Sequence, residues 1–139
     1  MKKLGLDIGT ARIGIATSDS LGIIASPHSV YKRKFLKADA GYIATLAKSL
    51  ECDTIVVGKP LKLNGTSGQS VAFVEEFIGE LKNLTEIPIE LQDERLSTVS
   101  AERVLIEGNV RREKRKDLID SVAATIILQN YLDKPKKQV

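Results

Sequence analysis

The sequence predicts an α/β fold, a mixed sheet with helices on both faces. Two observations predict it. Over the first thirty residues apolar and polar positions alternate with a period of two, which is typical of half-buried strands. Beyond them, stretches with helical spacing alternate with short apolar runs, which indicates crossover connections within one sheet. We therefore expect a three-stranded antiparallel meander followed by αβαβα crossovers.

The first three elements are expected to be strands joined by short turns. Gly9-Thr10 and Asp19–Gly22 supply turn residues between them, and Pro27 interrupts the third strand. The expected strands are Leu4–Ile8, Ile13–Thr17 and Ile23–Tyr31.

Helical spacing begins after this meander. Apolar residues recur at helical intervals over Ile43–Leu50 and again over Val74–Leu81. Between these segments, Thr54–Gly58 is a continuous apolar run, which is typical of a strand covered on both faces. Ile89–Glu94 is expected to be the next strand.

Two helices are expected at the end of the chain. Ser97 or Thr98 is a suitable N-cap for the first, and Gly108 follows its expected C-terminal end. The second is expected to run from about Lys116 to Leu132.

The 139 residues, of which 42% are apolar and 4% aromatic, predict a single domain over 1–139, with a core at about 3–132 and a basic tail at 133–139. No apolar run is long enough to span a membrane, and the first residues do not have the pattern of a secretory signal. We therefore expect a cytoplasmic protein with no membrane partner. The single cysteine, Cys52, is expected to be a buried or half-buried thiol.

Positive charge is concentrated in three basic islands, although the net charge is only +3. Such islands suit a phosphate backbone, but solvated turns and a frayed tail explain them equally well. The islands are Arg111–Lys116, Lys32–Lys34 with Lys37, and Lys134 with Lys136 and Lys137.

Three acidic residues are candidates for a functional site because of their positions in the expected strands and helix. Asp7 interrupts an apolar strand, where an ionised carboxylate requires a cation, a proton or a hydrogen-bond network. Glu94, beside Asp93, ends the last strand, where sheet proteins place ligand-binding groups. Asp120 shares a largely apolar helical face with Ala124. If the first strand is central and the last helix packs across it, Asp7, Glu94 and Asp120 meet at one edge.

Three carboxylates at one site need a compensating cation, because each disfavours the ionisation of the others. Mg²⁺ or Mn²⁺ suits such oxygen ligands and supports phosphodiester cleavage. We expect Asp7, Glu94 and Asp120 to be both metal ligands and catalytic residues. Taken singly, Asp120 can also be a carboxylate near a helix N-terminus that the helix dipole stabilises, and Glu94 can be a solvated acid at a strand end. The only histidine, His28, is better explained as structural than as catalytic, so water activation falls to metal ions.

The turn after the first strand, Asp7-Ile8-Gly9-Thr10 with Arg12 beyond it, offers a carboxylate, a close backbone approach and a hydroxyl beside a phosphate. Actin-like ATPases and sugar kinases use a similar turn. Those proteins need two lobes and a second phosphate turn, and this chain fits neither requirement.

Four short sequence blocks, taken together, form a highly specific pattern. They are Leu4–Thr10 with Arg12–Gly14, Val56–Gly58 with Pro60-Leu61 and Asn64-Gly65, Asp93–Thr98 with Ala101-Glu102, and Asp120 with Ala123-Ala124. From about Lys3 to Leu132 the chain thereby resembles the YqgF family, also called RuvX-like, of bacterial proteins with an RNase H-like fold. The resemblance implies a metal-dependent nuclease that processes the 5′ end of pre-16S rRNA in ribosome biogenesis, or a Holliday junction resolvase acting on branched DNA. A non-catalytic nucleic-acid-binding protein in transcription or ribosome assembly is the alternative.

The resemblance also implies roles for residues. Asp7, Glu94 and Asp120 fall on the active-site acids of the family, Arg95 is placed to meet a phosphate or to steady Glu94, and contributions from Asp93 and Asp117 stay open. Pro60–Gly68 is expected to be a mobile loop, and it is more basic than in relatives. The expected substrate-binding residues are Thr10, Arg12, Lys59, Lys62, Asn64, Arg95, Arg111, Arg112, Lys114 and Arg115.

The expected partners are structured RNA, branched DNA or ribosomal precursor particles. Because aromatic residues are few, we expect recognition of shape and backbone rather than of base sequence. The chain is expected to be a monomer or a weak homodimer. Symmetric cleavage of a junction requires two active sites and hence a two-fold dimer, so a strict monomer weighs against a resolvase.

Overall fold

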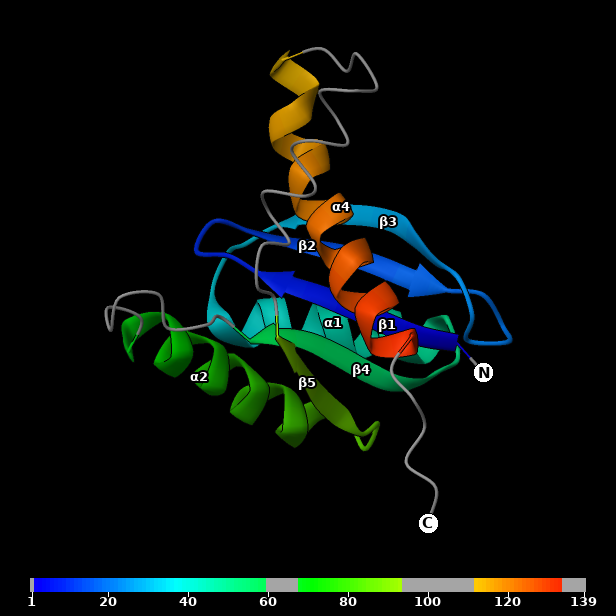
Figure 1. The fold of residues 1–139 in the computed structure, drawn as a ribbon. Helices are drawn as coiled ribbons and strands as arrows, with labels where there is room; N and C mark the ends of the chain where they lie inside the picture. The colour runs from blue at the N-terminus through cyan, green and yellow to red at the C-terminus, as the bar shows by residue number, and fades with distance from the viewer. Residues whose placement is uncertain (1, 60–67, 94–111, 134–139) are drawn as a thin grey trace.

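The computed structural model describes residues 2–59, 68–93 and 112–133. Its elements form one five-stranded mixed sheet in the order β3-β2-β1-β4-β5, so the first strand is central (Figure 1). The helix expected after Ser97 or Thr98 and most of the loop Pro60–Gly68 lie outside the described residues. The elements are β1 (Lys2–Ile8), β2 (Arg12–Ser18), β3 (Ala25–Lys32), α1 (Leu36–Ser49), β4 (Cys52–Lys59), α2 (Gly68–Leu84), β5 (Ile89–Asp93) and α4 (Arg112–Leu132).

The antiparallel meander is confirmed, with β2 paired to β1 on one side and to the edge strand β3 on the other. The expected start of β3 is wrong, because Ile23 and Ile24 precede the strand and are exposed. The carboxylate of Asp19 accepts hydrogen bonds from the backbone N–H groups of Ile23 and Ile24 at 2.7 and 3.1 Å, which extends the turn by two residues. Pro27 is tolerated in β3 because edge strands accept residues without an N–H donor.

The parallel half of the sheet consists of β1, β4 and β5, which are joined through helices. β4 is covered on both faces, as its unbroken apolar run predicts. Ile55 and Val57 pack with the core under α1 and α2, whereas Val56 packs with residues of α4. Cys52, at the start of β4, is buried as expected, and burial raises the pKa of its thiol.

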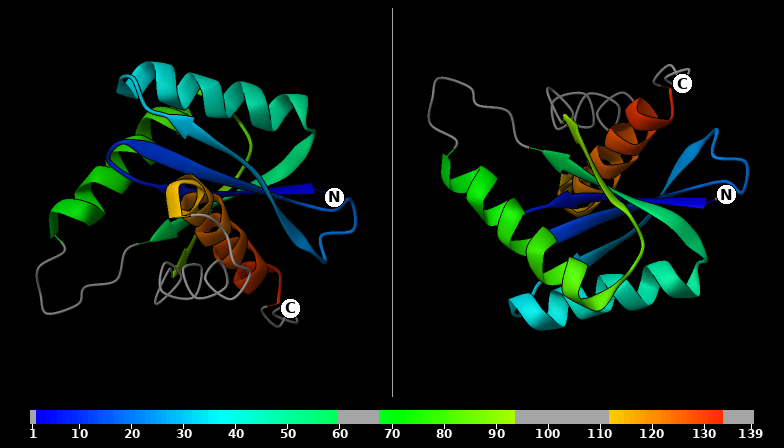
Figure 2. Two further views of the ribbon diagram at one scale, coloured as in Figure 1. Left: turned by 90° about the horizontal axis from the view of Figure 1, so that it is seen from above. Right: turned by 90° about the horizontal axis from the view of Figure 1, so that it is seen from below.

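Two unequal layers cover the sheet: α1 and α2 lie on one face and α4 crosses the other (Figure 2). Leu4, Leu6, Ile13 and Ile15 fill the face under α1 and α2 and are fully buried. The other face has smaller side chains, so α4 comes very close to β1. A Cβ atom placed on Gly5 would lie 2.7 Å from the Cβ of Leu128, which only glycine avoids.

α4 begins at Arg112, earlier than the expected Lys116, so Arg112, Lys114 and Arg115 belong to the helix instead of preceding it. Among the described residues, no helix is long and apolar enough to cross a membrane.

Candidate active site

Asp7 lies on the face of β1 that α4 covers. Its chain neighbours Leu6 and Ile8 belong to the core under α1 and α2, and alternate strand residues point to opposite faces. Gly5, two residues earlier, is the residue against which α4 packs. The carboxylate of Asp7 is therefore directed away from the aliphatic core, and the residue is half-buried.

Glycine flanks Asp7 on both neighbouring strands. Gly14 of β2 is its partner in the antiparallel register. In the parallel register Leu6 pairs with Val57, so one further step places Gly58 of β4 beside Asp7. Neither strand neighbour therefore places a side chain of its own beside the carboxylate.

Gln92 of β5 extends the same row, because it pairs with Gly58. Its side chain faces α4, since Glu90, two residues earlier, hydrogen-bonds the hydroxyl of Tyr131 on that helix. Gln92 is 8% exposed, and its Oε1 has no hydrogen-bond partner among the described residues. A buried polar atom without a partner costs about 1–3 kcal/mol and calls for an explanation.

The sequence analysis missed Gln92 because polarity does not predict burial in this edge strand. Ile89 packs against the core under α1 and α2, but Leu91 on the same face is 45% exposed, whereas the polar Gln92 on the α4 face is buried. No local pattern marks Gln92, since its environment depends on Gly58 and α4.

α4 brings the chain around Asp120 to the same face. The carbonyl oxygen of Ala124 would lie 3.2 Å from a Cβ on Gly5, and Asp120 precedes Ala124 by about one helical turn. Ser121 is buried and, with Arg12, lines a hollow beside β3. The side chain of Asp120 and all of Glu94 lie outside what the structure describes, so the meeting of the three acids stays a prediction.

A buried ion pair braces the turn that follows Asp7. Arg33 donates from Nε to Asp39 at 2.9 Å and from its guanidinium to the Gly9 carbonyl oxygen at 3.0 Å. The turn itself needs glycine, because a Cβ on Gly9 would lie 2.8 Å from the carbonyl oxygen of Arg12. Arg33 also lies 4.6 Å from the ring centroid of Phe73, which adds a cation–π contact.

Asp39 stays ionised within this brace. Burial raises the pKa of its carboxyl group, but hydrogen bonds from the Lys34 N–H, the Arg33 side chain and Tyr31 outweigh burial and hold it below its ordinary value. This ion pair changes the interpretation of the basic island at Lys32–Lys34 with Lys37, because one of its four cations is used within the fold. Arg33 is a structural cation, whereas Lys32, Lys34 and Lys37 are exposed.

The remaining substrate-binding candidates are only partly described. Thr10 is exposed at the turn and Arg12 is half-buried at the start of β2. For Lys59, Arg112, Lys114 and Arg115 the structure places the backbone within β4 or α4. The candidates Lys62, Asn64, Arg95 and Arg111 lie outside the described residues.

Among the described side chains, no three His, Cys, Asp or Glu residues converge on a metal position. The residues around Asp7 nevertheless fit a divalent cation. The row offers the Asp7 carboxylate and the unpartnered Oε1 of Gln92, and the two glycines between and beside them add no side chain. Oxygen donors are the ligands that Mg²⁺ and Mn²⁺ prefer, and these ions complete their coordination with water and phosphate oxygens.

Comparison with known sequences places the chain among annotated relatives. A protein of Syntrophomonas wolfei subsp. wolfei is 47% identical over 133 residues, which cover 96% of this chain and 94% of the relative. One of Halothermothrix orenii is 45% identical over 137 residues, covering 99% and 98%. Both carry the name "Putative pre-16S rRNA nuclease".

Two solved structures with a similar fold are bound to Holliday junctions. RuvC of T. thermophilus in complex with a Holliday junction substrate matches with a TM-score of 0.62 and 14% identity, covering 95% of this chain and 93% of that chain. The fowlpox virus resolvase, also bound to Holliday junction DNA, gives a TM-score of 0.52 and 13% identity, covering 96% and 100%. These likenesses show that the mixed sheet has the RNase H-like fold of RuvC-type resolvases.

The sequence profile of the RuvX family, described as Holliday junction resolvase, matches residues 1–134. With this match and relatives above 40% identity over nearly their whole length, the chain belongs to the RuvX family.

Proposed function

We propose that the protein is a metal-dependent nuclease that hydrolyses phosphodiester bonds at the 5′ end of pre-16S rRNA. The observation that carries the proposal is the row across the α4 face of the sheet, where Asp7 lies between two glycines and the unpartnered oxygen of Gln92 belongs to the next strand but one. The names of relatives more than 40% identical support the substrate.

In this proposal Asp7, Glu94 and Asp120 hold Mg²⁺ or Mn²⁺, with Oε1 of Gln92 directed to the same place. When bound, the divalent ion supplies water activation and neutralises charge on the phosphate. Thr10 and Arg12 then contact the phosphate from the turn, and the Arg33–Asp39 brace keeps that turn in position. Resolvase-like nucleases depend in general on divalent ions, which supports the metal.

Resolution of Holliday junctions is the second candidate, supported by the description of the family. It places a stricter requirement on assembly, because symmetric incision needs two active sites related by a two-fold axis. For pre-16S rRNA a monomer suffices, and the natural target is then a ribosomal precursor particle. The oligomeric state on the substrate therefore separates the two candidates.

The test compares the full-length protein with its Asp7→Asn variant on a pre-16S rRNA fragment and on a four-way DNA junction, each with Mn²⁺. We expect metal-dependent cleavage of the RNA, and we expect the variant to lose more than about 100-fold in rate, because even groups that only support a metal ligand contribute up to that factor. Glu75→Gln, which changes an exposed carboxylate on α2, is the matched control and should cleave normally.

Three outcomes of this experiment decide between the pre-16S rRNA nuclease, the resolvase and the non-catalytic binding protein. Full activity of Asp7→Asn, or undiminished activity of the wild type in excess chelator, rejects the metal-dependent nuclease. Cleavage of the junction alone, by a dimer, transfers the proposal to resolvase activity. Tight binding without cleavage of either substrate supports a non-catalytic nucleic-acid-binding protein.

A further inference from the structure

Two aromatic side chains are exposed where β3 leads into α1. Phe35, the N-cap residue of α1, is 65% exposed, and Tyr42, seven residues later, is 40% exposed. Residues seven apart lie on the same side of a helix. The other four aromatic residues of the chain are buried or half-buried. Two exposed rings on one side of a helix forgo hydrophobic stabilisation and are typical of a contact surface.

The ring of Tyr42 is held in place by Tyr31 of β3. The two rings stack with their centroids 4.3 Å apart and an angle of 17° between their planes. Tyr31 in turn hydrogen-bonds Asp39, the buried carboxylate of the ion pair with Arg33. A side chain fixed in this way loses little conformational freedom when a ligand binds, so it suits a preformed contact surface.

Exposed lysines accompany the aromatic residues. They are Lys32, Lys34 and Lys37. The only acidic residue in the segment 31–42 is Asp39, which is buried and paired with Arg33. The exposed charge of this segment is therefore entirely positive. Rings beside cations complement single-stranded nucleic acid, because its bases have flat faces and its phosphates are anions.

This surface adjoins the turn after β1. The backbone N–H of Arg33 donates to the carbonyl oxygen of Ala11 at 2.9 Å, and its guanidinium donates to that of Gly9 at 3.0 Å. Figures 1 and 2 show the turn and the start of α1 at the same end of the sheet. Because the next two residues are Lys34 and Phe35, a strand bound at the candidate active site can continue across both.

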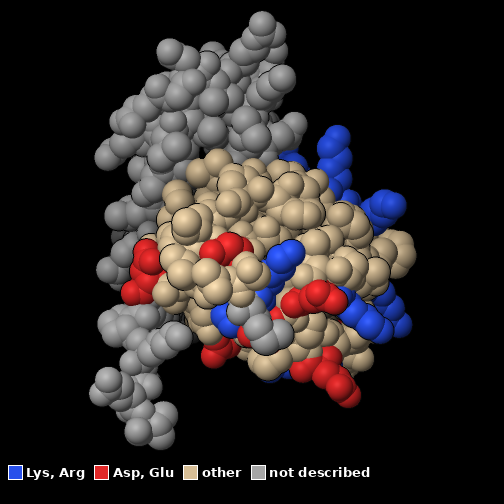
Figure 3. All heavy atoms as spheres, turned by 90° about the vertical axis from the view of Figure 1, so that its right-hand side faces the viewer, with Lys and Arg blue, Asp and Glu red and all other residues tan. Residues whose placement is uncertain are grey.

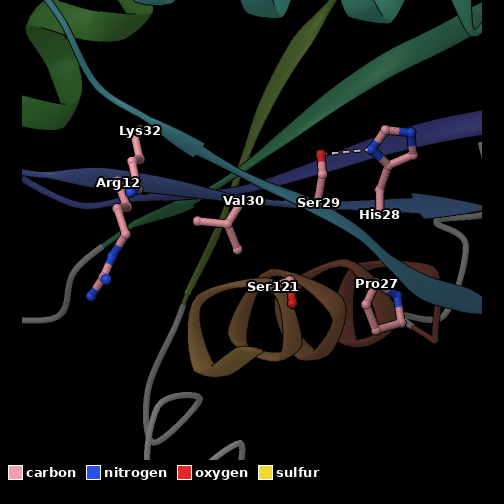
Figure 4. Close-up of a pocket in the computed structure, with 7 residues that line it drawn as sticks. All are labelled: Arg12, Pro27, His28, Ser29, Val30, Lys32 and Ser121. Atoms are coloured by element: carbon pink, nitrogen blue, oxygen red, sulfur yellow. Dashed lines mark hydrogen bonds between the residues drawn. The ribbon is translucent and has the colours of Figure 1, made fainter. Parts of the chain in front are cut away.

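Lys32 extends the positive surface to the face of the sheet that α4 covers. It lines a hollow between β3 and α4, which Ser121 lines from the helix (Figure 4). Its chain neighbour Tyr31 packs on α1 instead, because alternate residues of a strand point to opposite faces. The edge strand therefore offers a cation on the face of the candidate active site and an aromatic ring on the other face.

The opposite end of the molecule has a different surface. Figure 3 shows the end at which β1 begins, where Lys and Arg side chains are interspersed with Asp and Glu around a broad uncharged area. A net charge of +3 over 139 residues is also too small to attract nucleic acid by itself. Binding then depends on local surfaces such as the one around Phe35.

We infer that the surface around Phe35 binds an unpaired stretch of the nucleic-acid strand beside the scissile phosphate. A base stacks on the Phe35 ring, Tyr42 offers the next ring along α1, and Lys34 contacts the adjoining phosphate. This inference rests on the proposed function for the position of the scissile phosphate. It narrows the substrate class to strands with unpaired bases, since neighbouring bases cover the faces of bases inside a duplex. A fully paired four-way junction lacks such bases.

The test measures binding of a single-stranded RNA, of DNA with the same sequence and of the corresponding duplexes to the full-length protein in excess chelator. Phe35→Ala should weaken single-strand binding about 10-fold, because stacking of one base on an aromatic side chain contributes about that factor. Duplex binding should not change. Phe35→Trp should restore single-strand affinity. Leu84→Ala, which shortens an exposed apolar side chain at the end of α2, is the matched control and should alter neither affinity.

Two further measurements separate stacking from charge. Wild type and Phe35→Ala should bind an abasic single strand equally, because that probe has no bases to stack, and a difference between them contradicts stacking. Lys34→Ala should reduce the slope of log K against log salt by about 0.7, the value for one phosphate contact on a single strand. Lys48→Ala, which removes an exposed cation in the last turn of α1, is the control and should leave the slope unchanged.

Equal single-strand affinities of wild type and Phe35→Ala overturn the inference, even when cleavage with Mn²⁺ is intact. An equal loss of affinity for single strands and duplexes also overturns it, because stacking requires unpaired bases. Binding that depends on Phe35 without cleavage of any substrate supports the surface and removes only the nuclease proposal. Because Phe35 and Lys34 are exposed, each variant should keep the circular dichroism melt of the wild type.

Discussion

The two faces of the sheet are built from the same strands but are filled in opposite ways. On the face under α1 and α2, Leu4, Leu6, Ile13 and Ile15 are fully buried and form the larger core. On the face under α4, the intervening positions are Gly5, Asp7, Gly14 and Ala16 in the two central antiparallel strands. Large aliphatic residues stabilise the fold on one face, and small or polar residues make room for a site on the other.

Because of this difference, neighbouring residues of the same strand serve either the stability of the core or the candidate site. A residue in β1 contributes to the core or to the candidate site according to whether its position is even or odd. The Arg33–Asp39 pair is the exception, because it is buried at the end of the aliphatic side and contacts the backbone of the turn after Asp7. Substitutions on the two faces should therefore have different signatures in stability and in activity.

The largest effect on stability is expected for Asp39→Asn. The side chains of Arg33 and Asp39 are only 9% and 1% exposed, so removing one charge leaves the other buried without compensation, at a cost of about 3 kcal/mol. Urea unfolding measures this loss. The matched control is Asp53→Asn, which breaks the more exposed pair with Lys3 and should cost less than about 1 kcal/mol.

The same pair predicts a dependence on pH. Because the pKa of Asp39 is lowered in the folded protein, its ionised form stabilises the fold above its ordinary pKa of 3.8, and this contribution is lost as the pH falls through the folded value. The difference in unfolding free energy between wild type and Asp39→Asn should therefore shrink below about pH 4. A constant difference down to acid unfolding contradicts an ionised Asp39.

A smaller effect is expected for Gly5→Ala. The added Cβ would lie 2.7 Å from Leu128 and 3.2 Å from a backbone oxygen of α4, so the helix must shift, at a cost of about 2 kcal/mol. Gly79→Ala in α2 has nothing within 4 Å of the added Cβ and should stabilise the protein by about 0.5 kcal/mol or more. Equal effects of the two substitutions contradict close packing of α4 on β1.

The smallest effect, and one of opposite sign, is expected for Gln92→Leu. Removing a buried oxygen without a partner should stabilise the metal-free protein by about 1 kcal/mol. The rise in melting temperature on adding Mn²⁺ should become smaller, because an oxygen directed to the metal is lost. Leu91→Gln, on the exposed side of β5, should change neither quantity. An unchanged response to Mn²⁺ in Gln92→Leu removes Gln92 from the site.

Local patterns were sufficient for most of the architecture. Alternation with a period of two predicted β1 and β2, helical spacing predicted α1 and α2, and an unbroken apolar run predicted a strand buried on both faces at β4. The errors lie at element ends. β3 starts late because the Asp19 carboxylate extends the preceding turn, and α4 starts early, at Arg112, among charged residues that periodicity of apolar residues does not register.

For the site, the sequence by itself determined that Asp7 is anomalous, because a carboxylate in an apolar strand stands out without any knowledge of contacts. Only the tertiary structure decided what surrounds it. Gly14 and Gly58 lie beside Asp7 through strand pairing, Gln92 is buried through the next strand, and Arg33 holds Gly9 across 24 residues of chain. These relations depend on strand order, register and helix packing, which join residues far apart in sequence and leave no periodic signal within any one segment.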